Sequence, residues 1–167
     1  FHPDITPRSF RAFELAKELD ATIELINIVE LYSAGSDMVP YVPTAIDEKS
    51  VYESMIVRLT DYLLEHQQYN LHIQRTGVPF EDLLVSTEEP HTISIDVHSV
   101  IIKGIAAHHE IVDYANDNAD IVVMNTHGRT GLSRVFIGST TEQVSKHIEK
   151  PLLVMKPQFY EEEVEHT

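Results

Sequence analysis

IVVMNTHGRTGLSRVFIGSTT, residues Ile121–Thr141, is the stretch that decides the fold. It begins with an apolar run to Met124, which predicts a buried strand. A loop follows in which Gly128 and Gly138 are separated by nine residues. Ser139 then stands three places before an acid, the pattern of a helix start with serine as the cap. The stretch therefore predicts a strand, a glycine-spaced loop and a helix.

Such a junction is typical of a phosphate site. The first turn of a helix presents unpaired N–H groups and the positive end of the helix dipole, and a glycine lets backbone come close to a ligand. Residues 125–156 carry five basic and two acidic residues, so the formal net charge of this segment is +3 and that of the remainder is −18. We interpret the junction as an anion site; the alternative is that surface cations fall there without a ligand.

Length, composition and charge limit the classes of protein to which this chain can belong. The 167 residues, 43% of them hydrophobic, fit one domain over 1–157 followed by an acidic tail over 158–167. A formal net charge of −15 opposes binding to nucleic acid or to an anionic membrane. No apolar run approaches the roughly 20 residues of a membrane helix. The chain has no cysteine, which fits the cytoplasm, where we expect it.

Helical and strand-like segments alternate along the chain, which predicts an α/β fold with a largely parallel sheet. The predicted helices follow Thr6-Pro7 and cover Asp47–His66, 106–117 and Ser139–Glu149; the predicted strands are Ala21–Val29, His98–Lys103, Ala119–Met124 and Pro151–Met155. In this alternation a strand should precede the first helix. We therefore expect that the first strand is largely missing from the given chain.

Residues 69–97 form an atypical insertion. They are too many for a plain connection in a compact domain. We expect a short helix near Phe80–Leu84 and strand character near Thr92–Val97.

The segment Asn125–Lys156 closely resembles the universal stress protein family. That family's signature is Gly, two residues, Gly, nine residues, Gly, then Ser or Thr; here Asn125, Gly128, Gly138 and Ser139 stand at those places. The surrounding THGRTG and the terminal KPLLVMK match as well. At the front, DITPRSFRAFELAKEL is similar to the family's first loop and helix. The resemblance covers most of the chain, except roughly residues 69–97.

The resemblance implies an adenine nucleotide alpha hydrolase-like fold. This is an open, doubly wound, mostly parallel five-stranded sheet of order 3-2-1-4-5, with helices on both faces. ATP or another adenine nucleotide, with or without Mg²⁺, would bind outside the carboxyl ends of the strands. By position, Asp4 would approach the adenine and the backbone at Val29 would line its other edge. The ribose and phosphates would meet the remaining implied residues: Asn125, Gly128, Arg129, Gly138, Ser139 and Thr140.

Two of these residues have a second interpretation. Asp4 is also explained as an acid that satisfies N–H groups near a helix start. Asn125 departs from the family pattern, because nucleotide-binding members carry glycine there. Asparagine tolerates positive φ, so the turn is compatible with it, but its side chain adds bulk beside the ribose.

We assign no catalytic residues and no metal site. No P-loop motif GxxxxGK[ST] is present, and no residue is marked to activate water. His108 and His109 are adjacent on a predicted helix, so their side chains should point about 100° apart and not share an ion.

The sequence predicts a nucleotide-binding regulator of the stress response whose ligand state is read by a partner. The first alternative is a nucleotide-free dimeric interaction module of the same fold, and the second is a slow ATPase. In each case the resemblance implies a homodimer paired through Pro151–Met155, an apolar sheet edge.

Overall fold

The computed structural model describes residues 9–31, 47–67, 70–87, 92–125 and 138–155. Their element order is α1 (Ser9–Leu19), β1 (Ile23–Glu30), α2 (Glu48–Glu65), β2 (Leu71–Arg75), β3 (Glu81–Ser86), β4 (Ile93–Gly104), α3 (Ala107–Asn118), β5 (Val122–Asn125), α4 (Ser139–His147) and β6 (Leu152–Met155). The predicted alternation of helix and strand is confirmed outside the insertion. No helix in these ranges is long and apolar enough to cross a membrane.

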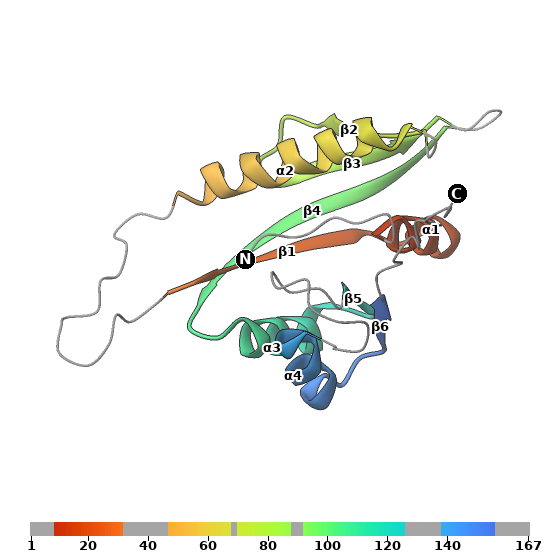
Figure 1. The fold of residues 1–167 in the computed structure, drawn as a ribbon. Coiled ribbons are helices and arrows are strands. Elements are labelled where there is room, and N and C mark those ends of the chain that lie inside the picture. The colour runs from red at the N-terminus through yellow and green to blue at the C-terminus, as the bar shows by residue number, and fades with distance from the viewer. Residues whose placement is uncertain (1–8, 32–46, 68–69, 88–91, 126–137, 156–167) are drawn as a thin grey trace, which may run out of the picture.

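The strands form two sheets, as Figure 1 shows. One has four strands in the order β1-β4-β3-β2, and the other has two, β5-β6. β1 pairs with β4 in parallel, with Ile23 opposite Val97 and Glu30 opposite Gly104. β5 pairs with β6 in parallel, with Val122 opposite Leu152. The hairpin β2–β3 adds two antiparallel pairings beside β4.

This topology corrects the predicted single, mostly parallel sheet of order 3-2-1-4-5. The two parallel pairs correspond to the neighbours 2-3 and 4-5 of that order. The predicted first strand is not among the described residues, and the described strands hydrogen-bond in two groups. The outer edge of β4 also carries the hairpin, which makes the larger sheet mixed.

The hairpin β2–β3 replaces the helix predicted near Phe80–Leu84. In β3 the side chains at Asp82 and Leu84 are buried at alternate positions of a strand. The turn before it contains Gly77 at φ +86°, and the Thr76 hydroxyl donates to the carbonyl of Glu81 at 2.6 Å. The predicted helix was wrong because this turn reverses the chain and pairs β3 with β2, while β4 pairs with the other edge of β3. The strand predicted near Thr92–Val97 is confirmed and continues to Gly104 as β4.

Helices pack on both faces of the larger sheet, as predicted. On one face α1 and α2 pack against β3 and β4 through one hydrophobic cluster, whose buried members are Phe13, Ala16, Leu59, Leu63, Leu84, Ile95 and Val97. A second cluster joins β1, α3 and α4 through Ile28, Ala107, Ile111 and Val144, with Met124 of β5 packed against it. Figure 1 shows α2 on one side of β1 and β4, and α3 and α4 on the other. The second cluster therefore joins the two sheets without a strand pairing between them.

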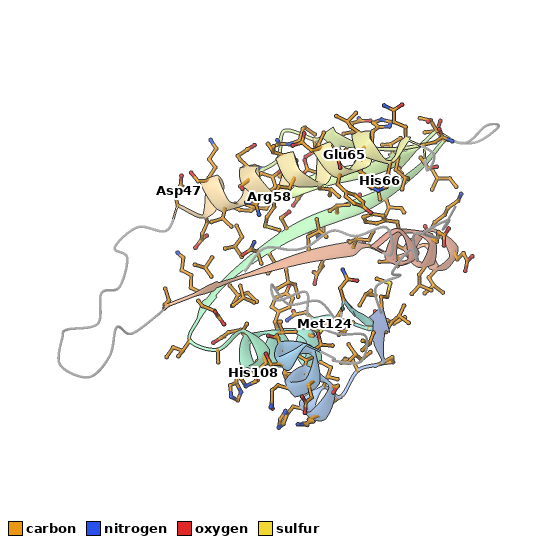
Figure 2. The ribbon with its side chains drawn as sticks, in the orientation of Figure 1. Asp47, Arg58, Glu65, His66, His108 and Met124 are labelled. Atoms are coloured by element: carbon orange, nitrogen blue, oxygen red, sulfur yellow. The ribbon has the colours of Figure 1, made fainter. Side chains whose placement is uncertain are left out.

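Local sequence explains where α2 begins. Asp47 is its N-cap, and its side chain accepts a hydrogen bond from the Lys49 N–H at 3.2 Å. The apolar residues then recur at helical spacing, so that Tyr52, Met55, Ile56, Leu59 and Leu63 are buried. Asp47 and Glu65 mark the two ends of this helix in Figure 2.

Candidate functional site

The carboxyl ends of β1 and β5 and the first turn of α4 form the candidate site. Ile28 and Met124, which directly precede Val29 and Asn125, pack with the same hydrophobic cluster. Figure 2 shows Met124 on β5, on the side of β1 where α3 and α4 lie. Both strands therefore contribute a residue to this cluster.

The described part of the chain holds five of the eight predicted site residues: Val29, Asn125, Gly138, Ser139 and Thr140. Val29 is half-buried and lies opposite Lys103 in the β1–β4 ladder. Asn125 is the last residue of β5. Gly138, Ser139 and Thr140 begin α4. Asp4, Gly128 and Arg129 lie outside the described residues.

The N-cap of α4 differs from the prediction. Gly138, and not Ser139, occupies the cap position, and a glycine has no side chain with which to cap the helix. The predicted reciprocal cap is also absent, because Glu142 pairs with Lys146 at 2.7 Å, one turn further along the helix. With Gly138 as the cap, Ser139 and Glu142 each lie one position too far into the helix for that cap.

Pairing with Lys146 also affects the ionisation of Glu142. Its hydrogen bond to the ammonium group holds the pKa of this carboxyl below the ordinary 4.5. The carboxylate is thus ionised and engaged along the helix. It is not used to cap the first turn.

Thr141 fixes the start of α4 to the end of β5. Its hydroxyl donates to the main-chain carbonyl of Asn125 at 3.0 Å, and the side chain is only 3% exposed. The sequence analysis did not single out Thr141. The sequence feature that could have indicated it is the helical spacing of Thr141 and Val144, which places both residues on the buried face of α4.

Two carboxylates make contacts near the carboxyl end of β1 and the neighbouring end of β4. Glu30, which follows Val29, accepts a hydrogen bond from the Ala107 N–H at 3.3 Å and so serves the first turn of α3. Lys103 pairs with Glu48 at 2.7 Å. These contacts depend on pairing between distant segments, so no local motif indicated them. The start of α3 is thus served by the carboxylate of Glu30.

His108 and His109 lie with their rings close together at the start of α3. Their ring centroids lie 4.3 Å apart at an interplanar angle of 37°. Figure 2 shows His108 on α3. Within the described ranges no group of three His, Asp or Glu side chains is arranged to hold a metal ion.

Fold and site together define an α/β domain in which helices cover both faces of a sheet and a glycine-capped helix starts beside a strand end. The sequence matches the family described as "Universal stress protein family" over residues 10–156. The chain belongs to the universal stress protein family.

Similar proteins agree with this family. The chain is 41% identical over 70 residues to universal stress protein MJ0577 of Methanocaldococcus jannaschii, a match over 41% of this chain and 43% of that protein. It is 30% identical over 156 residues to universal stress protein E of Escherichia coli K12, covering 91% of this chain and 43% of that protein. The matched part is thus less than half the length of either relative.

Among solved structures, universal stress protein UspA from Lactobacillus plantarum is similar to this chain at 20% identity and a TM-score of 0.49. That match covers 91% of this chain and 92% of the other.

Proposed function

We propose that this domain is a cytoplasmic nucleotide-binding regulator that holds ATP or a related adenine nucleotide at the start of α4. Membership of a family in which many members bind ATP supports the proposal. The observation that carries it is the first turn of α4, which begins at a glycine cap without a side-chain cap. Nucleotide state would be read by a partner protein.

The residues present fit a polyphosphate. A helix start offers N–H donors and the positive end of a dipole, which together favour an anion. Gly138, Ser139 and Thr140 would give the phosphates N–H and hydroxyl donors, and Ser139 is exposed. Asn125 with Gly128 would face the ribose and phosphates, and Arg129 would add positive charge.

The adenine would lie towards β1, between Asp4 and the backbone at Val29. In this proposal the site lies outside the carboxyl ends of parallel strands, where open α/β sheets bind ligands. Mg²⁺ would accompany the phosphates.

Titration calorimetry on the purified chain tests the proposal. ATP, ADP and AMP are titrated with and without Mg²⁺, and we expect saturable heat that depends on the number of phosphates. Absence of heat at millimolar nucleotide would remove the proposal. Excess nucleotide absorbance in the purified protein, which has no tryptophan, gives a rapid first indication.

A nucleotide-free dimeric interaction module is the second candidate. It is favoured by Asn125, a bulkier residue than glycine beside the proposed ribose position. β6 is an edge strand of its sheet, and Leu153 on it is 41% exposed. In this case the dimer forms through Pro151–Met155 and the calorimetry is negative.

A further inference from the structure

A hydrogen bond between residues sixteen positions apart holds the start of α4 to the end of β5. Thr141 Oγ donates to the carbonyl of Asn125 at 3.0 Å, with a sequence separation of 16. Both residues belong to regular elements, Asn125 ending β5 and Thr141 lying in the first turn of α4. The bond therefore closes the strand-to-helix junction at its base.

Apolar packing alone does not fix this geometry. Val144, fully buried one turn later, attaches α4 to the cluster shared with Ile28 and Ile111. Such contacts are not directional and tolerate small rotations of a helix about its axis. A hydrogen bond loses strength quickly when its angle departs from linear, so the Thr141 hydroxyl restricts that rotation.

The same contact sets where the first-turn amides lie. The helix begins with the Glu142 N–H bonded to the carbonyl of Gly138 at 2.9 Å. The N–H groups of Ser139 and Thr140 precede that bond, so they belong to the unpaired donors of the first turn. Their position relative to Asn125 follows from the position of Thr141.

We propose that Thr141 is a positioning residue for the phosphate donors at the start of α4. Its hydroxyl holds the donor array against the end of β5 without touching the nucleotide. This inference rests on the proposed function for its ligand. The junction geometry itself can be measured in ligand-free protein.

Three variants separate this role from general stability. Thr141→Val keeps the side-chain shape and removes the hydroxyl, and Thr141→Ser keeps the hydroxyl. Ser145→Ala is the matched control, since Ser145 Oγ donates to the carbonyl of Glu142 within the same helix at 2.7 Å. The measurements are the Kd for ATP by calorimetry and the amide spectrum and hydrogen exchange of ligand-free protein by NMR.

We expect Thr141→Val to raise the Kd for ATP roughly five- to tenfold, the factor that corresponds to losing one neutral hydrogen bond. Thr141→Ser should restore binding to within about twofold, and Ser145→Ala should leave it unchanged. In ligand-free protein, the Ser139 and Thr140 amides should shift and exchange faster in the valine variant alone. Wild-type affinity together with unshifted amides in Thr141→Val overturns the proposal.

Failure of the proposed function is distinguishable from failure of this inference. If wild-type protein binds no ATP, the proposed function falls, and the ligand-free amides still decide whether Thr141 positions the helix start. If Thr141→Val does not fold, Thr141→Ser and Thr141→Ala replace it, because both lose the methyl group and only serine keeps the hydroxyl. Equal amide spectra for these two variants overturn the inference.

Discussion

Tyr52 and Asp82 meet in the interior between α2 and β3, where the Tyr52 hydroxyl donates to Asp82 Oδ2 at 2.8 Å. Both residues are 2% exposed. Arg75 Nε lies 3.0 Å from Asp82 Oδ1, and its guanidinium carbon stands 5.1 Å from the centre of the Tyr52 ring. This network ties the hairpin β2–β3 to the helix that covers it.

Removing Arg75 should destabilise the fold. A buried carboxylate that loses its cationic partner carries an uncompensated desolvation cost. Because Arg75 is 46% exposed, water relieves part of that cost, and we expect Arg75→Met to lower the free energy of unfolding by about 1–3 kcal/mol. Urea unfolding measures the change.

The matched control is Glu53→Gln. This change removes the exposed partner of the same arginine, 3.0 Å away, and leaves Asp82 paired. Its cost should be smaller than that of Arg75→Met, because an exposed ion pair contributes little to stability. Equal losses for the two variants would contradict the importance of the buried carboxylate.

Stability should fall at alkaline pH because of Tyr52. Burial, reinforced by the hydrogen bond to Asp82, raises the pKa of Tyr52 above the ordinary 10.0. The folded state then holds this proton more tightly than the unfolded state. The resulting stabilisation is present below pH 10.0 and is lost as the pH rises through the raised pKa.

Urea unfolding between about pH 8 and pH 11 tests this, together with phenolate absorbance. Tyr52→Phe should weaken the alkaline decline. Tyr114 also contributes, since burial, followed by the charge of Glu24, raises its pKa. The Tyr114→Phe variant therefore measures how much Tyr114 contributes to the loss of stability at alkaline pH. If both variants keep the wild-type pH profile, tyrosine ionisation is not the cause of that loss.

Gly138→Asp should separate nucleotide binding from folding. Gly138 has φ −56° and ψ 147°, which other residues adopt, so the substitution does not strain the backbone. Aspartate is a favoured N-cap and its carboxylate would occupy the first-turn amides of α4. We expect equal or slightly higher thermal stability, with ATP binding abolished in calorimetry.

Gly138→Ala is the control for that substitution, because it adds a side chain without a charge or an acceptor. It should weaken ATP binding less than aspartate does. Unchanged ATP binding in Gly138→Asp would mean that the nucleotide lies elsewhere.

Leu153→Lys should dissociate the proposed dimer. Leu153 lies on the edge strand β6, and a charge at a sheet edge disfavours pairing with another chain. Sedimentation should show a dimer for the wild type and a monomer for the variant. Val57→Lys on α2 is the control, since Val57 is 55% exposed and lies on another element. Monomeric wild-type protein at micromolar concentration would exclude the dimer.

The sequence predicted most element positions because their signals are local. α2 was predicted as Asp47–His66 and observed as Glu48–Glu65, since the Asp47 cap and the apolar spacing lie within the segment itself. The insertion was predicted less well. EDLLVS buries Asp82, Leu84, Val85 and Ser86, a pattern without clear alternation, and its pairing with β4 is not visible within the segment itself.

In the candidate site, too, local sequence signals were predictive and features set by tertiary contacts were not. The glycine spacing, which lies within one short segment, was enough to indicate the β5–α4 junction and the family. Which residue caps α4 was not decided by the motif, because Ser139 and Gly138 differ by one position and both residue types are common at helix caps. That the predicted residues line a nucleotide remains a prediction.

By itself the sequence determined the order of helices and strands outside the insertion and the family, because periodicity, caps and glycine spacing act over a few neighbouring residues. Tertiary structure alone decided that residues 71–86 add a hairpin beside β4, that Asp82 is buried against Tyr52, and that a threonine hydroxyl closes the helix junction. These features depend on contacts between residues far apart in the chain, whose partners are fixed only when the sheet and helices pack.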